Sequence, residues 1–542
     1  MNLRSFLFAA FVAVVSASVI QVPAAFATDT LVTVEGGRIR GTLEKPGSGV
    51  CVFRGIPFAH PPVGSFRWKP PAAVDPWSGT RDCTQFGSNC PQPAQKIIRG
   101  IAGPQSEDCL YLNVWTAAAP GEARPVMVWI HGGGFILGSG SQPHYDGLNF
   151  AEDGAVQVTI NYRLGPFGFM AHPALSAESP EHVSGNYGLL DMIAALRWVR
   201  TNIAAFGGNP DNVTIFGESA GSAAVGCLIA SPLARGLFHR AIMESGVPAK
   251  LPLLHGSEAN DSTAEAAGVA IASQAGIDSP AGTGAETAAK LRAISPDELL
   301  KAANPRIGLF GKGRRMGPAI DGYVVPRDPL AMYAAGEANN VPVMIGSNAD
   351  EGTLFLQQIP IRRPFGYRIA AQRLFGSYAD RVLDLFPVRT ADDVRPAVAR
   401  LVTVGAFVAP ARRAARALSA HNPNVWMYHF TRVAPLLRER GVGATHGAEI
   451  FYVFKTFPAA TSPESQDYAV AAAMHGAWLR FAIAGNPNPD GPPAWPAFTP
   501  ANDTYMEFGD RIGAGSGLFS RECDLFDAMS ASRAAVPAGG ER

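Results

Sequence analysis

The segment TIFGESAGSAAVG places Ser219 between two glycines, in the pattern Gly217-x-Ser219-x-Gly221. It follows the run VTIF, which is typical of a strand, and continues into AGSAAVGCLIA, which is typical of a small-residue helix. A serine on a sharp strand-to-helix turn needs glycine on both sides, because a side chain there would clash with the tightly folded backbone. Such a turn lifts the hydroxyl out of the sheet, so the pattern predicts a nucleophilic serine for acyl transfer.

A second glycine-rich segment, HGGGF at residues 131–135, follows the apolar run VMVWI. A nucleophile that attacks a carbonyl needs N–H donors for the oxyanion, and each donor is typically worth about 3 kcal/mol of transition-state stabilisation. The glycines leave the N–H groups of Gly133 and Gly134 open to a ligand, and the N–H of Ala220 points to the same space. The two motifs together therefore predict an oxyanion hole.

A serine nucleophile also needs a base, and an acid that orients the base, in the chain order serine, acid, histidine. VPVMIGSNADEG offers Asp350 and Glu351 directly after a strand-like run, and the residues alone do not choose between them. His446 lies in the glycine-rich loop of GVGATHGAEIFYVF. The alternatives for the base are His429, inside a strand-like run, and His475, on a helical run where a packed histidine is expected.

The elements that must position these groups alternate along the chain. Strands buried on both faces are indicated by four continuous apolar runs, at residues 126–130, 155–162, 213–216 and 341–347. Apolar residues recur at helical spacing over 188–207, and a hairpin is expected over 31–43. The alternation predicts an α/β fold with a largely parallel sheet. We expect helical insertions over 255–303 and 353–420 to wall the site.

Residues 1–27 form a separate segment. Arg4 precedes an apolar core at residues 6–20, and AFA at residues 25–27 offers a cleavage site between small residues. This pattern predicts a cleaved signal peptide, a mature chain that begins near Thr28, and a secreted or periplasmic protein. No later run predicts a membrane span, and residues 536–542 are expected to be a flexible tail.

Charge and cysteine content exclude several classes of partner. The chain has 45 Lys and Arg against 45 Asp and Glu, which gives no reason to expect binding to nucleic acid or anionic membranes. Six cysteines in an exported chain permit disulfides, but no CxxC or Cys/His spacing predicts a metal site. Length alone suggests about three domains.

Seven segments make the chain resemble the type B carboxylesterase and cholinesterase-like family of the α/β-hydrolase fold. They are FRGIPFAHPPVGSFRWKPP, SEDCLYLNVW, VMVWIHGGGF, INYRLGPFGF, GNYGLLDMIAALRWVRTNIAAFGGNPDNVTIFGESAGS, SNADEG and HGAEIFYVF. The resemblance covers nearly all of the chain after the signal peptide. It implies one domain over residues 28–535, with a mostly parallel central sheet, helices on both faces and helical insertions.

The resemblance also implies the catalytic residues. The acid of the DEG motif falls on Glu351, and the histidine that opens HG-x-E falls on His446. The oxyanion donors fall on Gly133, Gly134 and Ala220. His446, held by Glu351, would take the proton of Ser219 as it attacks an ester carbonyl, and water would then repeat the sequence on the acyl-enzyme. This hydrolysis of a small-molecule ester needs no cofactor and no metal.

Supporting residues are implied in the same way. Ser245, in MESG, would steady Glu351, while Glu218 and Glu449 match acidic residues near the histidine. The family's disulfide before LYLN implies a Cys90–Cys109 bridge. It leaves four cysteines unassigned, and Cys227 is expected to be a buried free thiol on the helix after Ser219.

Three neighbouring functions are weighed against ester hydrolysis. Neuroligin-like adhesion relatives keep the fold and lose the nucleophile, whereas Ser219, Glu351 and His446 are intact here. Choline esterases bind the quaternary ammonium on a tryptophan between the two disulfide cysteines. The corresponding loop, PQPAQKIIRGIAGPQSED, has no aromatic residue, so choline esters are rejected. Lipase activity on long acyl chains stays open.

A basic segment, QQIPIRRPFGYR, follows Glu351 and carries Arg362, Arg363 and Arg368. A solvated basic turn is the simpler interpretation. The alternative hypothesis is that Arg362 and Arg363 recognise a carboxylate on a polyacid ester. In that case alanine at both positions raises KM for anionic esters and leaves neutral esters unchanged.

Overall fold

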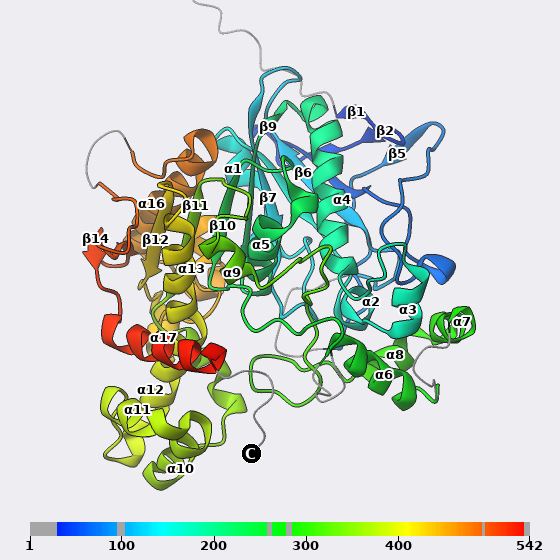
Figure 1. Cartoon of the computed structure of the whole chain (residues 1–542). Coiled ribbons are helices and arrows are strands. Elements are labelled where there is room, and N and C mark those ends of the chain that lie inside the picture. Colours follow the sequence, from blue (N-terminus) through cyan, green and yellow to red (C-terminus); the bar gives the residue numbers. More distant parts are fainter. Residues whose placement is uncertain (1–29, 95–102, 257–262, 278–283, 490–493, 536–542) are drawn as a thin grey trace, which may run out of the picture.

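The computed structural model describes residues 30–94, 103–256, 263–277, 284–489 and 494–535 (Figure 1). The predicted signal peptide at 1–27 and the predicted tail at 536–542 lie outside these ranges.

Eleven strands of the described chain form one sheet, in the order β14-β13-β12-β11-β10-β9-β7-β8-β6-β4-β3. The seven central strands, β13 to β8 in this order, are parallel to one another, and the pairs at both edges are antiparallel. The largely parallel sheet predicted from the apolar runs is therefore confirmed. The strands are β3 (Thr42–Leu43), β4 (Cys51–Pro57), β6 (Tyr111–Thr116), β7 (Arg124–Ile130), β8 (Val156–Ile160), β9 (Gly208–Glu218), β10 (Arg240–Glu244), β11 (Val343–Asn348), β12 (Val425–Phe430), β13 (Thr504–Phe508) and β14 (Ile512–Ser516).

A smaller sheet stands beside the large one. The predicted hairpin is present as β1 (Leu31–Val34) and β2 (Gly37–Arg40), which pair antiparallel, and β5 (Thr80–Asp82) extends it. The disulfide Cys90–Cys109 that the family resemblance implies is formed. Cys227 is buried and free on the helix after Ser219, as expected.

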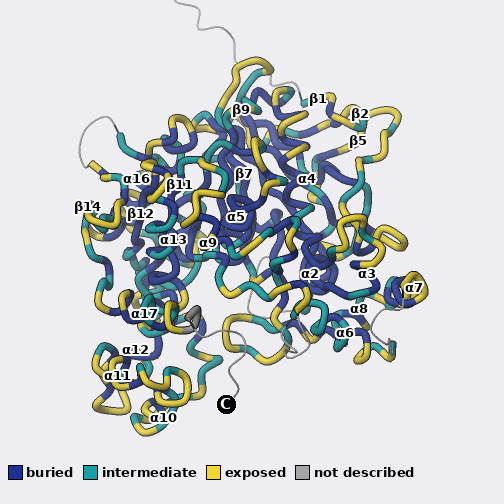
Figure 2. Tube along the Cα trace, in the orientation of Figure 1, coloured by how far each residue is buried: buried dark blue, intermediate teal, exposed yellow. Residues whose placement is uncertain are grey.

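Strand β7 shows why helices must cover both faces of the sheet. Successive side chains of a strand point to opposite faces. Val126, Val128 and Ile130 belong to one buried cluster, whereas Met127 and Trp129 belong to another. Figure 2 shows the buried interior along β7 and β9, between exposed outer loops. An apolar strand of this kind is stable only between two layers, which is the α/β-hydrolase arrangement that the resemblance implies.

The first face is covered by α4 (Tyr187–Asn202), α5 (Ala220–Ala230), α9 (Pro329–Ala334) and α13 (Ala409–Ser419), and the second by α1 (Leu148–Glu152), α15 (Ile450–Val453) and α16 (Ser465–Ala484). The predicted helix over 188–207 is α4 followed by the 3-10 turn η3 (Ile203–Phe206), and Gly207 ends it in the left-handed conformation with φ 77°. Other short elements are η1 (Gly64–Phe66), η2 (Pro143–Tyr145), α2 (Gly165–Phe169), α3 (Pro173–Glu178), η4 (Pro232–Ala234), α14 (Pro435–Glu439) and η8 (Ala459–Thr461).

Two groups of helices extend from one end of the sheet, at the lower edge of Figure 1. The first consists of α6 (Ala264–Gln274), α7 (Ala285–Ala293) and α8 (Pro296–Ala303), as expected for residues 255–303. The second consists of η5 (Glu351–Gln358), α10 (Pro364–Phe375), η6 (Gly376–Tyr378), α11 (Ala379–Leu385), α12 (Ala391–Val402) and the π-helical turn η7 (Thr403–Val408), against which α17 (Ser520–Ala535) packs.

The prediction that all of residues 353–420 form an insertion is wrong at its end. Helix α13 packs its alanine-rich face on β11 and β12 and buries Ala411, Ala414 and Leu418 in the core of the sheet. It belongs to the layer of helices that covers the sheet, because its apolar stripe can be buried only against these strands. Among the described helices, the continuous run 391–419 is the one long and apolar enough to cross a membrane, and 61% of its most apolar window is buried inside the fold.

Candidate active site

Ser219 stands on the turn between β9 and α5 with φ 57° and ψ −116°, a conformation that few non-glycine residues adopt. The two flanking glycines are required by contact with β7. A Cβ on Gly217 would lie 2.5 Å from the carbonyl oxygen of Ile130, and a Cβ on Gly221 would lie 2.0 Å from it. The strained serine is therefore held where the end of β9 and the start of α5 pack against the end of β7.

The structure brings Ser219, His446 and Glu351 into one hydrogen-bonded chain. Ser219 Oγ lies 2.8 Å from His446 Nε2, and His446 Nδ1 lies 2.5 Å from Glu351 Oε2. Glu351 is fully buried at the start of η5, and its Oε1 accepts the backbone N–H of Asn348 at 2.8 Å. A carboxylate held in this way fixes the imidazole with its other nitrogen toward the serine, as nucleophile activation requires.

The alternatives left open by the motifs do not enter this chain. Asp350, the other candidate acid, accepts the backbone N–H of Ala444 at 2.9 Å. His429 contacts the carbonyl of Ser347, and His475 contacts the carbonyl of Val453. The geometry therefore agrees with the assignment of Glu351 and His446 that the family resemblance implies.

Glu218 adds a second negative group at the histidine, because its Oε1 lies 3.1 Å from His446 Nε2. Burial by itself lowers the pKa of His446, but the charges of Glu218 and Glu351 outweigh it and raise that pKa to about 9. Burial raises the pKa of Glu218 to about 7 and that of Glu449 to about 8. Burial therefore favours the protonated forms of Glu218 and Glu449, and the site carries less negative charge than its composition suggests.

The prediction that Ser245 steadies Glu351 is wrong. Its hydroxyl donates to Glu449 Oε1 at 3.2 Å and not to Glu351. Both oxygens of Glu351 already have partners, Asn348 and His446. Asn348 was not assigned a role from the sequence, yet its side chain donates both to Glu449 and to the carbonyl of Thr445, next to His446. It therefore links the acid loop to the histidine loop.

The glycine-rich loop after β7 lies against the serine turn. A Cβ on Gly132 would lie 3.2 Å from Ser219 Cβ, and Gly133 and Gly134 have φ values of 105° and 66°. Within the described chain, the backbone N–H groups of these two glycines have no acceptor. Ala220 is the first residue of α5, so its N–H also lacks an acceptor within the helix. Three donors are thus available at the turn, as an oxyanion hole requires.

Two aromatic rings pack on the catalytic histidine. The ring centroids of Phe355 and Phe407 lie 5.4 Å and 4.8 Å from that of His446. Phe407 comes from the π-helical turn η7, in which Thr403 Oγ1 also accepts the N–H of Gly352 at 2.9 Å. A helical insertion is expected over 353–420, but the sequence contains no signal for a π-turn or for the contact with His446.

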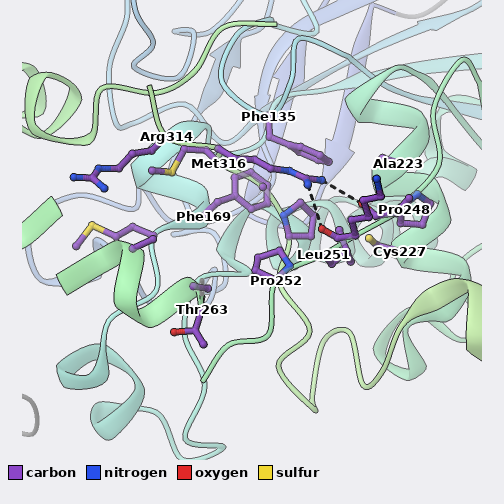
Figure 3. A pocket seen from close by; sticks show the side chains of 18 of the residues that line it. Phe135, Phe169, Ala223, Cys227, Pro248, Leu251, Pro252, Thr263, Arg314 and Met316 are labelled. Atoms are coloured by element: carbon purple, nitrogen blue, oxygen red, sulfur yellow. Dashed lines mark hydrogen bonds between the residues drawn. The ribbon is translucent and has the colours of Figure 1, made fainter. Parts of the chain in front are cut away.

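A cavity of about 490 Å³ lies between α5 and α6 (Figure 3), and neither Ser219 nor His446 is among the residues that line it. We call it the α5–α6 pocket. Its wall includes Phe135, directly after the oxyanion loop, Ala223, one turn along α5 from Ser219, and Val247, two residues after Ser245. Neither Arg362 nor Arg363 lines it, and Arg362 donates to carbonyls of its own turn. No group of three or more metal-ligating side chains is found among the residues that the structure describes.

Comparison with known proteins identifies a family. The sequence profile of the "Carboxylesterase family" matches residues 28–526. The chain is 41% identical over 492 residues to the fumonisin B1 esterase of Sphingopyxis macrogoltabida, covering 88% of this chain and 87% of that protein. It is 37% identical to the para-nitrobenzyl esterase of Bacillus subtilis strain 168, with 87% and 93% covered. The solved carboxylesterase of Geobacillus stearothermophilus superposes with a TM-score of 0.78 at 37% identity, over 92% of this chain and 100% of that chain.

Glu351 and Asp350 can be separated by one matched pair of substitutions. Glu351→Gln keeps the shape of the acid but removes the charge that holds the histidine tautomer, so kcat should fall by about 10⁴-fold. Asp350→Asn keeps an acceptor for Ala444 and should retain activity to within about fivefold. Steady-state kinetics on a p-nitrophenyl ester measures both, and an equal loss in the two variants would contradict the assignment.

The pH profile tests the contact between Glu218 and His446. The base must be neutral, so kcat/KM falls as pH drops through the raised pKa of His446. Glu218→Gln removes a charge that raises this pKa and should move the acid limb of the profile to lower pH by about one unit. The control Glu286→Gln, on the exposed surface of α7, should leave the limb in place. A limb that stays or moves upward in Glu218→Gln would rule out the electrostatic role.

Proposed function

Because the chain belongs to the carboxylesterase family, we propose that Ser219, His446 and Glu351 carry out its hydrolysis of carboxylic esters through an acyl-enzyme. The observation that supports this assignment is the unbroken chain of short contacts from Ser219 Oγ through both nitrogens of His446 to Glu351. Asp350, His429 and His475, the alternatives that the sequence offered, are engaged elsewhere.

The reaction follows from these contacts. His446 Nε2 takes the proton as Ser219 Oγ attacks the ester carbonyl, and Glu351 stabilises the imidazolium that forms. The N–H groups of Gly133, Gly134 and Ala220 hold the oxyanion of the tetrahedral intermediate. His446 then protonates the leaving alcohol. Water enters, loses its proton to the same nitrogen and attacks the acyl-enzyme, which releases the acid and restores Ser219.

The sequence left two alternative functions, an idle binding protein and a lipase for long acyl chains. An idle binding protein conflicts with the intact hydrogen-bonded chain of Ser219, His446 and Glu351. A lipase for long acyl chains differs from a short-chain esterase in the length of the acyl group it accepts. The wall of the α5–α6 pocket carries Lys250, Arg314 and Arg315 among apolar residues, and a long alkyl chain packed against these groups would cost their hydration. The fumonisin B1 esterase that resembles the chain makes fumonisin B1 a further candidate substrate.

Hydrolysis of a p-nitrophenyl ester series by the mature protein tests the proposal. Short chains should be cleaved, and Ser219→Ala should lose at least about 10³-fold in kcat while it keeps its fold. Ser231→Ala is the matched control, because this buried hydroxyl at the other end of α5 has no hydrogen-bond partner in the described structure. Full activity in Ser219→Ala would contradict the assignment, and a maximum at long chains would favour the lipase.

We also propose that the protein is exported, with residues 1–27 as its signal peptide. Small residues at positions 25 and 27 support cleavage after Ala27. Expression of the full chain in a bacterium should give a protein outside the cytoplasm whose N-terminal sequence starts at Thr28, and Ala27→Arg should block the cleavage. A cytoplasmic product that retains Met1 would contradict the proposal.

A further inference from the structure

The charged residues of the α5–α6 pocket are all basic. Lys250, Arg314 and Arg315 are the ionisable side chains of its wall apart from the thiol of Cys227, and no carboxylate is found among its described lining residues. The rest of the wall is mostly apolar and includes Phe135, Phe169 and Leu251 (Figure 3). A pocket that is apolar on one side and basic on another suits a ligand with both characters.

Two of the three basic residues of the wall, Arg314 and Arg315, come from a segment without acidic residues. Residues 299–320 contain Lys301, Arg306, Lys312, Arg314 and Arg315, and no Asp or Glu. None of these five side chains has an ion pair within the described part of the chain. Desolvation and, as the second cause, the like charge of Arg306 lower the pKa of Arg315, although this residue is exposed to solvent. Positive charge without a partner attracts anions.

Arg315 is held across the pocket by the backbone. Its Nη1 donates to the carbonyl of Lys250 at 3.1 Å, and its Nη2 donates to the carbonyl of Ala249 at 3.3 Å. These bonds leave its charge without a carboxylate partner. A guanidinium already fixed in this way loses little conformational entropy when it binds a carboxylate.

The pocket and the reacting serine share helix α5 and the ring of Phe135, although Ser219 is not itself part of the pocket wall. Ala223 lines it, and the N–H of Ala223 donates to the carbonyl of Ser219 at 2.9 Å. Gly317, two residues after Arg315, packs against the ring of Phe135, directly after the oxyanion loop. The basic wall and the oxyanion loop thus meet at this ring.

We propose that Arg315, with Arg314 and Lys250, binds a carboxylate, so that the preferred substrates are esters that retain a free acid group a few bonds from the scissile carbonyl. Half-esters of short dicarboxylic acids belong to this class. The inference rests on the proposed function for the chemistry at Ser219. It differs from the hypothesis on Arg362 and Arg363, whose side chains do not line the pocket.

Two esters of the same length test the proposal. Mono-p-nitrophenyl glutarate carries a carboxylate, whereas p-nitrophenyl pentanoate is neutral. We expect the ratio of their kcat/KM values to fall about tenfold in Arg315→Gln, mainly through KM for the glutarate, and further in Arg314→Gln/Arg315→Gln. Arg315→Lys should recover part of the ratio. Lys312 is an exposed cation of the same segment that lies outside the pocket, so Lys312→Gln is the control. Because solvent screens its charge, this substitution should leave the ratio within about twofold of the wild type.

Three outcomes would overturn the inference: an unchanged ratio in both arginine variants, an equal fall in Lys312→Gln, or an equal loss on both esters. Calorimetric titration of glutarate into Ser219→Ala protein gives a second readout that does not depend on catalysis. Binding that weakens in the arginine variants supports the inference even if the wild type cleaves neither ester, which would refute the proposed function alone. Absence of glutarate binding, or binding that all variants keep, would overturn the inference.

Discussion

The carbonyl of Ile130 at the end of β7 lies so close to the β9–α5 turn that only glycine fits on either side of Ser219. This contact determines the position of the nucleophile. It also determines the position of the oxyanion loop, which begins at the residue after Ile130. Because β7 and β9 pair in parallel with Ile130 opposite Gly217, the loop and the turn leave the sheet side by side. A slip of one residue in this pairing would separate the attacking oxygen from the donors that must stabilise its product.

The second constraint is the burial of several carboxyl groups around one histidine. Glu218, Glu351 and Glu449 lie within the same buried region, and Glu244 lies beside them with the indole N–H of Trp478 on its Oε1. Burial raises the pKa values of Glu218, Glu244 and Glu449, so that protonation relieves their mutual repulsion. Among these four carboxyl groups, Glu351 is the one that contacts both a backbone N–H and the imidazole. The site thus stabilises one imidazolium without collecting four full negative charges.

The local sequence pattern predicted the regular helices and strands. It failed where contacts between distant segments determine the structure. Continuous apolar runs indicated β7, β8, β9 and β11, because a strand covered on both faces is composed mainly of apolar residues. The motifs predicted the serine turn and the glycine loop, but Asp350 and Glu351 are adjacent, and the choice between them depends on a histidine far along the chain. The partner of Ser245, the π-turn at η7 and the basic wall around Arg315 are set by packing between distant segments. The position of α13 was mistaken for the same reason, since composition does not indicate which surface an alanine-rich stripe will cover.

The spacing of the three catalytic groups along the chain links activity to the completion of folding. Ser219 and His446 are 227 residues apart, and Glu351 precedes His446 by 95 residues. They meet only after β9, β11 and β12 have joined one sheet, and such non-local pairing is the slow part of folding. During synthesis, the nucleophile emerges long before its base exists. An incomplete or unfolded chain is therefore inert toward esters, and ester cleavage is a direct assay of how much of a preparation has reached the native state.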